Sequence, residues 1–315
     1  MSLIGQTVWI VGGVGVVGRG IARGLLQAGA TVIVNSRSEE RLDRILNDLQ
    51  HPTRLIAIHG SLQPEQAKDT VDRALQEPEL SGKGLDHVVA HGAVRYWSTL
   101  QAGCDETFSL TKPTTNFLEL SPEEFMTASS TLARMHFAAA QQLVPQLQKP
   151  KIDPTSLDNP NSMIQSTYTF VTGDGGGHPS SLRTPMGELN SHHVWGLSAA
   201  LRRSLQNDPS VWMRELRVGM QVNRPLDVRE ADPRTRPLSE DIGDLMAGLV
   251  VTAQEKSGGS TTTSKFLRTY AQEKADGLIR IDSRADLDRL LKEYKADSDK
   301  NIGPLPTFAE FAGSL

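Results

Sequence analysis

Cysteine is almost absent from this chain of 315 residues, in which Cys104 is the single example. One thiol excludes an internal disulfide framework and any metal centre built on several cysteines, so the sequence fits a reducing compartment. Clusters of basic residues are missing too, because 33 Lys and Arg are scattered among 37 Asp and Glu, for a formal net charge of −4. We therefore expect neither a nucleic acid nor an anionic membrane surface as a partner.

Long apolar runs are also missing. No apolar run approaches the roughly 20 residues that a helix needs to span a bilayer. The first residues, MSLIGQTVWIVGG, lead directly into a predicted strand and lack the basic segment of a signal peptide. We expect a soluble, cytoplasmic protein. At this length the chain has room for one large α/β domain or two smaller ones.

Short β-rich runs alternate with segments of helical periodicity along most of the chain. Strands are predicted at 7–11, 31–35, 54–58, 86–90, 168–173, 213–220 and 277–282. This alternation predicts βαβ units and an α/β fold with a doubly wound, Rossmann-like parallel sheet. We assign residues 1–256 to a single domain, with an exposed insertion near 149–161, and residues 257–315 to a C-terminal extension that carries the last strand and helix.

Two helix ends carry clear local signals. Ser121, Pro122 and Glu124 form a predicted helix start, with a capping serine, a proline in the first helical position and a glutamate that completes a capping box. Gly29 follows the helical segment 16–28, where a glycine ends a helix without steric cost. Both helix boundaries are therefore predicted from short-range chemistry alone.

The turn after the first predicted strand is rich in glycine, since residues 12–18 read GGVGVVG. The pattern G-x-G-x-x-G between a strand and a helix is typical of dinucleotide binding, because glycine permits a tight turn and the helix N-terminus attracts a pyrophosphate. The predicted contacts to the cofactor are Gly12, Gly13, Gly15, Val17 and Gly18. The alternative is that these glycines serve only the packing of helix against strand.

The end of the second predicted strand favours NADP(H) over NAD(H). A site for NAD usually carries an acidic residue here, whereas a 2′-phosphate needs a cation. The sequence instead places Ser36, Arg37 and Ser38 at this point, so a guanidinium and two hydroxyls are available for a phosphate. The alternative is that Arg37 is an ordinary solvated arginine.

Several segments together resemble the short-chain dehydrogenase/reductase family over nearly the full length. They are the glycine turn, VNSRSEERL, DHVVAHGA, SPEEF to LVPQL, WGLSAALRRSL and LSEDIGDLMAGLV. The resemblance implies a nicotinamide cofactor along the carboxyl ends of the strands, a small-molecule substrate, and a homodimer or homotetramer built on two long central helices. It places Ser61 and Leu62 where the family holds adenine, and His91 and Gly92 beside the cofactor.

The chemical centre departs from the family. Its reductases use a serine after the fifth strand, a Tyr and a Lys at positions i and i+4 of the next helix, and an asparagine on the preceding helix, with the tyrosine donating the proton. Here these positions are occupied by Gly173 or Asp174 for the serine, Gly187 for the tyrosine, Ser191 for the lysine and Leu132 for the asparagine. None of the usual catalytic side chains is present.

Other residues are candidates for the missing chemistry. Asp174 follows a strand and is expected to face the nicotinamide as an acid or as a charge for a cationic substrate, unless it only forms a turn. Glu188 and His192 share a helix face, rotated by about 100° from that of the missing pair. His91 borders the predicted cofactor, although a structural role is equally open. We predict no metal site.

Three functions follow. The first is an NADP(H)-dependent oxidoreductase that acts on a carbonyl or on an imine or iminium. An iminium is already a cation and needs only a hydride. The second is a non-catalytic NADP(H)-binding sensor or scaffold. The third is a non-redox enzyme, a cyclase or lyase, that reuses the same pocket through Asp174 or a histidine.

Overall fold

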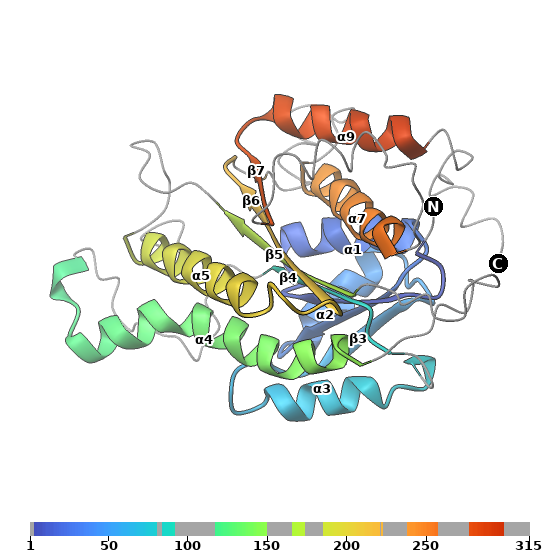
Figure 1. Ribbon diagram of the computed structural model, residues 1–315. Coiled ribbons are helices and arrows are strands. Elements are labelled where there is room, and N and C mark those ends of the chain that lie inside the picture. Colours follow the sequence, from blue (N-terminus) through green and yellow to red (C-terminus); the bar gives the residue numbers. More distant parts are fainter. Residues whose placement is uncertain are drawn as a thin grey trace.

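The computed structural model describes residues 3–80, 84–91, 117–149, 166–173, 185–220, 222, 238–257 and 277–298. Its centre is a seven-stranded parallel sheet with the order β3-β2-β1-β4-β5-β6-β7 (Figure 1). The strands are β1 Thr7–Val11, β2 Thr31–Ser36, β3 Leu55–His59, β4 His87–His91, β5 Ser166–Gly173, β6 Val211–Val218 and β7 Leu278–Ile281. The sheet winds outward from β1 on one side and from β4 on the other, which confirms the predicted doubly wound, Rossmann-like fold.

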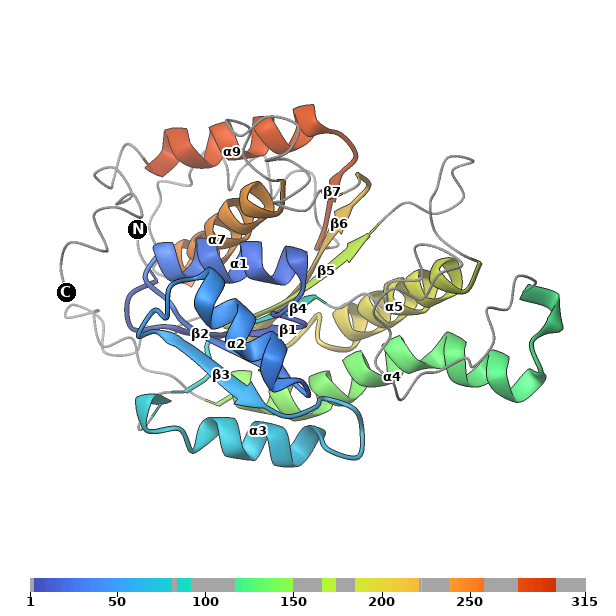
Figure 2. The same cartoon turned by 180° about the vertical axis from the view of Figure 1, so that it is seen from behind.

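Helices cover both faces of the sheet (Figures 1 and 2). They are α1 Val16–Gln27, α2 Glu39–Asp48, α3 Ala67–Leu75, α4 Pro122–Leu147, α5 Pro185–Ser204, α7 Leu238–Ser257 and α9 Arg284–Ser298, with short 3-10 turns η1 Pro78–Leu80 and η3 Phe117–Glu119. One core joins the sheet to α1, α2, α7 and α9, and a second joins it to α3, α4 and α5. Within the described residues, no helix is both long and apolar enough to cross a membrane.

The predicted helix ends are confirmed. The Ser121 hydroxyl accepts the Glu124 backbone N–H at 3.2 Å, and the Glu124 carboxylate accepts the Ser121 N–H at 2.8 Å. Gly29 follows α1 with a φ of +100°, a left-handed conformation in which a side chain would be strained. Both ends follow from local chemistry, and for this reason the sequence alone places them.

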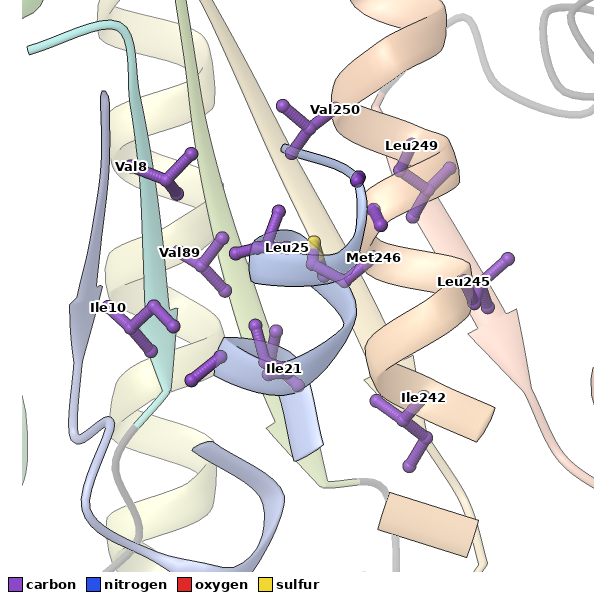
Figure 3. Close-up of a cluster of buried hydrophobic side chains, with 14 of the residues drawn as sticks. Val8, Ile10, Ile21, Leu25, Val89, Ile242, Leu245, Met246, Leu249 and Val250 are labelled. Atoms are coloured by element: carbon purple, nitrogen blue, oxygen red, sulfur yellow. The ribbon is translucent and has the colours of Figure 1, made fainter. Parts of the chain in front are cut away.

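Helices α1 and α7 approach each other closely at their glycines. They also share the buried cluster of side chains in Figure 3, which includes Ile21, Leu25, Ile242 and Met246. A Cβ added at Gly20 would overlap the carbonyl oxygen of Ser239, and one at Gly243 would overlap the carbonyl oxygen of Gly20. At Gly24 an added Cβ would lie 2.9 Å from the backbone nitrogen of Asp244. Glycine therefore sets the separation of the two helices, and with it the position of the turn that begins α1.

The last strand and helix of the chain belong to the same unit. Strand β7 pairs with β6 in register Leu216↔Ile279, and α9 contributes Leu287, Leu290, Leu291 and Tyr294 to the core beside α7. The Tyr294 ring occupies the space where a side chain at Gly248 would lie. The part of the predicted extension that the structure describes thus continues the domain, while residues 258–276 and 299–315 and the predicted insertion near 149–161, apart from Lys149 at its edge, lie outside the described ranges.

Candidate functional site

The sheet reverses its winding direction between β1 and β4. These strands pair side by side, with Val11 opposite Ala90, and the next described α-helices after them, α1 and α4, pack on opposite faces of the sheet. In open α/β sheets, ligands bind in the crevice outside the carboxyl ends of the strands at such a reversal. Gly12 and His91 stand at this point, so the predicted glycine turn lies where the topology favours a ligand.

The glycine turn has separate requirements for packing and for access. A Cβ at Gly18 would lie 2.6 Å from the carbonyl oxygen of Gly13, and one at Gly13 would lie 3.0 Å from the Cβ of Val34. Gly12 has a φ of +76°. At Gly15, however, the nearest atom of the described residues to an added Cβ is 3.5 Å away, an ordinary contact. Backbone conformation therefore explains the glycine at position 12 and packing explains those at positions 13 and 18, but neither explains the one at position 15.

The N-terminus of α1 is open. Gly15 is its capping residue and provides no side-chain hydrogen bond, and the first turn carries no acidic residue. The first N–H that is bonded within the helix is that of Arg19, which donates to the Gly15 carbonyl at 2.8 Å. The N–H groups of the first turn, with the positive end of the helix dipole, suit an anion. The turn therefore fits the pyrophosphate of a dinucleotide, with Val17 partly buried beneath it.

At the end of β2, Arg37 lies between two serines whose hydroxyls accept hydrogen bonds from the backbone. The hydroxyl of Ser36 accepts the Ser38 N–H at 3.1 Å, and the hydroxyl of Ser38 caps α2 by accepting the Arg41 N–H at 3.3 Å. Both hydroxyl protons remain available for donation, because in these bonds the oxygens act as acceptors. Arg37 between them is exposed. The predicted residues therefore lie together, and their donor set fits a 2′-phosphate.

His59 joins this group, although the sequence pattern does not single it out. It is the last residue of β3 and pairs in register with Ser36. Its Nε2 lies 3.0 Å from the carbonyl oxygen of Arg37, and its Nδ1 lies 3.9 Å from the carboxylate of Glu39. The signal that could have found it is the adjacency of β2 and β3 in a βαβ unit, which brings the ends of both strands together.

Ser61 and Leu62 are both buried. The backbone of Ser61 exchanges two hydrogen bonds with the Thr70 hydroxyl, at 3.0 and 2.9 Å, and the Ser61 hydroxyl accepts the Gln63 N–H at 3.1 Å. Leu62 belongs to the core beneath α3 and α4. These contacts fix the segment after β3, and a role of the pair in holding adenine stays a prediction.

The strand ends beyond β1 hold the remaining candidates. His91 is the last residue of β4, half-buried and opposite Val171 of β5. Gly173 ends β5. Gly92 and Asp174 lie outside the described residues, so their predicted roles are untested.

The residues predicted to stand at the family's acid and base positions are Gly187, Ser191 and Leu132. Gly187 is buried on α5, and the Ser191 hydroxyl donates to the Gly187 carbonyl at 3.0 Å, within the helix itself. Leu132 on α4 is 6% exposed and lies in the core. Tyr168 cannot replace the missing tyrosine, because it is fully buried and burial raises its pKa far above the usual range. The absence of the usual catalytic side chains from these positions stays a prediction.

Glu188 and His192 lie together on α5, as their spacing predicts. The His192 Nδ1 donates to the Glu188 carbonyl at 2.9 Å and lies 3.6 Å from the Glu188 carboxylate. The centroids of the His192 and Trp195 rings lie 4.3 Å apart with the rings tilted, and the Arg217 guanidinium lies over that indole at 4.6 Å. The buried face of α5 instead carries Gly187, Asn190, Val194 and Ser198. The Glu188–His192 pair lies outside this face. Its catalytic role stays a prediction.

A buried carboxylate fixes α5 to the sheet. Glu215 of β6 is fully buried and accepts hydrogen bonds from the hydroxyls of Thr172 and Ser198, at 2.8 and 2.9 Å. Two arginines balance its charge, Arg217 at 2.8 Å and Arg202 at 3.5 Å. Because these partners come from β5, α5 and β6, the network holds the helix beside the carboxyl end of the sheet. Within the described ranges, no three His, Cys, Asp or Glu residues are placed to share a metal.

Comparison with known proteins agrees with this geometry. A family model described as short chain dehydrogenase matches residues 6–151, which run from β1 to the end of α4. No curated protein matches the chain.

Solved structures share the fold over most of the chain. RhlG of Pseudomonas aeruginosa in complex with NADP is 19% identical, with a TM-score of 0.58 over 90% of this chain and 98% of that one. The 3-ketoacyl-(acyl-carrier-protein) reductase of Brucella melitensis with NADH is 18% identical, with a TM-score of 0.56 over 90% and 100%. An alcohol dehydrogenase of Thermococcus sibiricus with 5-hydroxy-NADP is 18% identical, with a TM-score of 0.53 over 78% and 90%. At these identities the likeness shows the fold alone.

Proposed function

Since the chain belongs to the short-chain dehydrogenase/reductase family, we propose that it binds NADP(H) and transfers a hydride between this cofactor and a small organic molecule. The observation that carries the proposal is the open N-terminus of α1 at the reversal point of the sheet, with room at Gly15 that packing does not use. The cofactor, when bound, supplies or accepts the hydride. The structures of similar fold that hold NADP, NADH or 5-hydroxy-NADP support a nicotinamide cofactor, without deciding about the 2′-phosphate.

In this proposal each part of the cofactor has its own protein groups. The first-turn N–H groups of α1 hold the pyrophosphate, and Arg37 with the hydroxyls of Ser36 and Ser38 holds the 2′-phosphate. His91 and the end of β5 border the nicotinamide side. Gly187 and Ser191 leave the usual proton donor out, so the acceptor best suited to this site is an iminium, which is already cationic and needs only the hydride. A neutral imine would first have to take up a proton from solution. A carbonyl would need its proton from Asp174, His91 or the Glu188–His192 pair.

The first test is a titration of the protein with NADPH and with NADH, followed by nicotinamide fluorescence. We expect NADPH to bind more tightly than NADH, because Arg37 recognises a group that NADH lacks. Failure of both nucleotides to bind would overturn the proposed function.

The second test separates the two kinds of acceptor by substitution of Asp174. If Asp174 is the acid, Asp174→Ala lowers kcat for a carbonyl by about 100-fold or more, since general acids typically contribute this much. Reduction of a preformed iminium should change little in the same variant, because that reaction consumes no proton. His192→Gln tests the Glu188–His192 pair as the acid in the same way. Equal carbonyl turnover in wild type and Asp174→Ala would remove the aspartate from the mechanism.

The missing acid and base also favour a second candidate, an NADP(H)-binding sensor or scaffold. It predicts tight binding of NADPH with no turnover across a broad panel of carbonyls and imines, and robust turnover would exclude it. A cyclase or lyase would form product without net consumption of NADPH. The homodimer or homotetramer expected through α4 and α5 stays a prediction, which sedimentation of the protein can test directly.

A further inference from the structure

The His59 imidazole lies beside two groups, the backbone of Arg37 after β2 and the carboxylate of Glu39 in α2. His59 ends β3 opposite Ser36, and its Nε2 lies 3.0 Å from the carbonyl oxygen of Arg37. A carbonyl oxygen only accepts hydrogen bonds, so Nε2 carries a hydrogen in both the neutral and the charged ring. His59 therefore holds the peptide of Arg37, the residue to which the proposed function gives the phosphate.

The second ring nitrogen faces a carboxylate. Nδ1 of His59 lies 3.9 Å from Glu39 in the first turn of α2. In the neutral ring this nitrogen has only a lone pair, which gains nothing from a carboxylate, whereas in the imidazolium it is a donor. Both side chains are solvent-exposed, at 55% for His59 and 80% for Glu39. The pair is thus accessible to a ligand and to protons.

Other charged groups lie on the elements around His59. On the α2 side, Glu40 is paired with Arg44 at 2.6 Å, and Arg41 follows it in the same turn. In the segment after β3, Glu65 lies 3.6 Å from Arg134. On the α3 side, a guanidinium nitrogen of Arg73 lies 3.0 Å from the position of a Cβ added at Gly60, the residue after His59. The charges set around the imidazole thus include those of Glu39, Arg37 and Arg73, and a phosphate bound beside Arg37 would add to them.

We propose that His59 is a positioning residue for the 2′-phosphate and becomes protonated when NADPH binds, so that the preference for NADPH over NADH increases at low pH. The inference rests on the proposed function. A phosphate monoester adds between one and two negative charges beside Arg37, and a nearby negative charge favours the charged form of histidine. Histidine is the side chain that changes charge between about pH 5 and pH 8, so binding that favours the imidazolium takes up protons in that range.

The sign of the pH effect follows from this linkage. Because protonation of the imidazole accompanies NADPH binding in this proposal, NADPH affinity is greatest at low pH and falls as pH rises. NADH lacks the 2′-phosphate, so its affinity should stay nearly constant over the same range.

The experiment compares wild type, His59→Gln and His59→Ala by calorimetric titration with NADPH and NADH. Measurements between about pH 6 and pH 8, in buffers of different ionisation enthalpy, report the protons taken up. Glutamine can still donate to the Arg37 carbonyl but cannot titrate, so His59→Gln should bind NADPH without the extra proton uptake and with a flatter pH profile. His59→Ala should lose NADPH affinity several-fold and leave NADH affinity unchanged.

The 2′-phosphate itself titrates near pH 6, so the difference between wild type and His59→Gln carries the test. A matched control is His51→Gln, because His51 is an exposed histidine beyond the other end of α2, bonded to Asn47 at 2.7 Å. His51→Gln should behave as wild type. Equal proton uptake in wild type and His59→Gln would overturn the inference while leaving the NADPH site intact, whereas no binding of NADPH by wild type would contradict the proposed function instead.

Discussion

Replacement of Gly15 by Asp should reduce NADPH affinity by about 100-fold while leaving the free energy of unfolding equal to or slightly above that of wild type. Gly15 is the capping residue of α1, with extended backbone angles and 3.5 Å of clearance for a Cβ, so the aspartate fits. An aspartate at this position can accept first-turn N–H groups and complement the helix dipole. The same carboxylate occupies the donors that a pyrophosphate needs and repels its charge. Gly15→Asp should therefore lose NADPH affinity without a loss in the free energy of unfolding.

Two variants of the same turn make this result interpretable. Gly15→Ala has room and adds no charge, so it should lower NADPH affinity less than Gly15→Asp. Gly18→Ala places a Cβ against the backbone of Gly12 and Gly13 and should lower the free energy of unfolding. Nicotinamide fluorescence gives the affinities and urea unfolding gives the stabilities. If Gly15→Asp bound NADPH as well as wild type, the glycines would serve packing alone.

The fold was predictable from the sequence because its signals are short-range. The alternation of strands and helices, the capping box at Ser121 and the glycine after α1 each depend on a few neighbouring residues. The buried line of α5 shows the limit of such signals. Hydrophobic spacing on this helix predicts Leu197 beside Val194, yet Ser198 is the fully buried residue because its hydroxyl serves Glu215. A polar group that is buried for a partner on another strand has no hydrophobic signature.

The candidate site divides in the same way. The glycine turn and the Ser36–Arg37–Ser38 group lie within single βα connections, so the sequence brings their members together. His59 and Glu215 reach their partners through the pairing of neighbouring strands. The pairing of β2 with β3 sets His59 opposite Ser36, and the pairing of β5 with β6 brings Thr172 and Arg217 together beside Glu215. These pairings become visible only when strand order and register are known. His192 shows the converse, because helical spacing accounts for its contacts with Glu188 and with Trp195 on the same helix, whereas the contact between Arg217 of β6 and the Trp195 ring is tertiary.

The contact between α1 and α7 predicts the largest effect on stability. Gly243→Ala should lower the free energy of unfolding by about 1–3 kcal/mol, because the added methyl meets backbone atoms of Gly20 and cannot move aside by rotation. Relief requires that α7 move away from α1, which opens the core around Ile21, Leu25 and Met246. Since α1 also presents the open N-terminus, a displaced helix should lower NADPH affinity as well.

The matched control is Gly196→Ala on α5. Gly196 is also within a helix, but no atom of the residues that the structure describes lies within 4 Å of an added Cβ there. Alanine loses less backbone entropy on folding than glycine, so this variant should gain about 0.5–1 kcal/mol. Urea unfolding of both variants therefore separates the helix propensity of alanine from the overlap of the two backbones. A Gly243→Ala protein as stable as Gly196→Ala would mean that α1 and α7 lie farther apart than the glycines require, and that the turn before α1 is not held by α7.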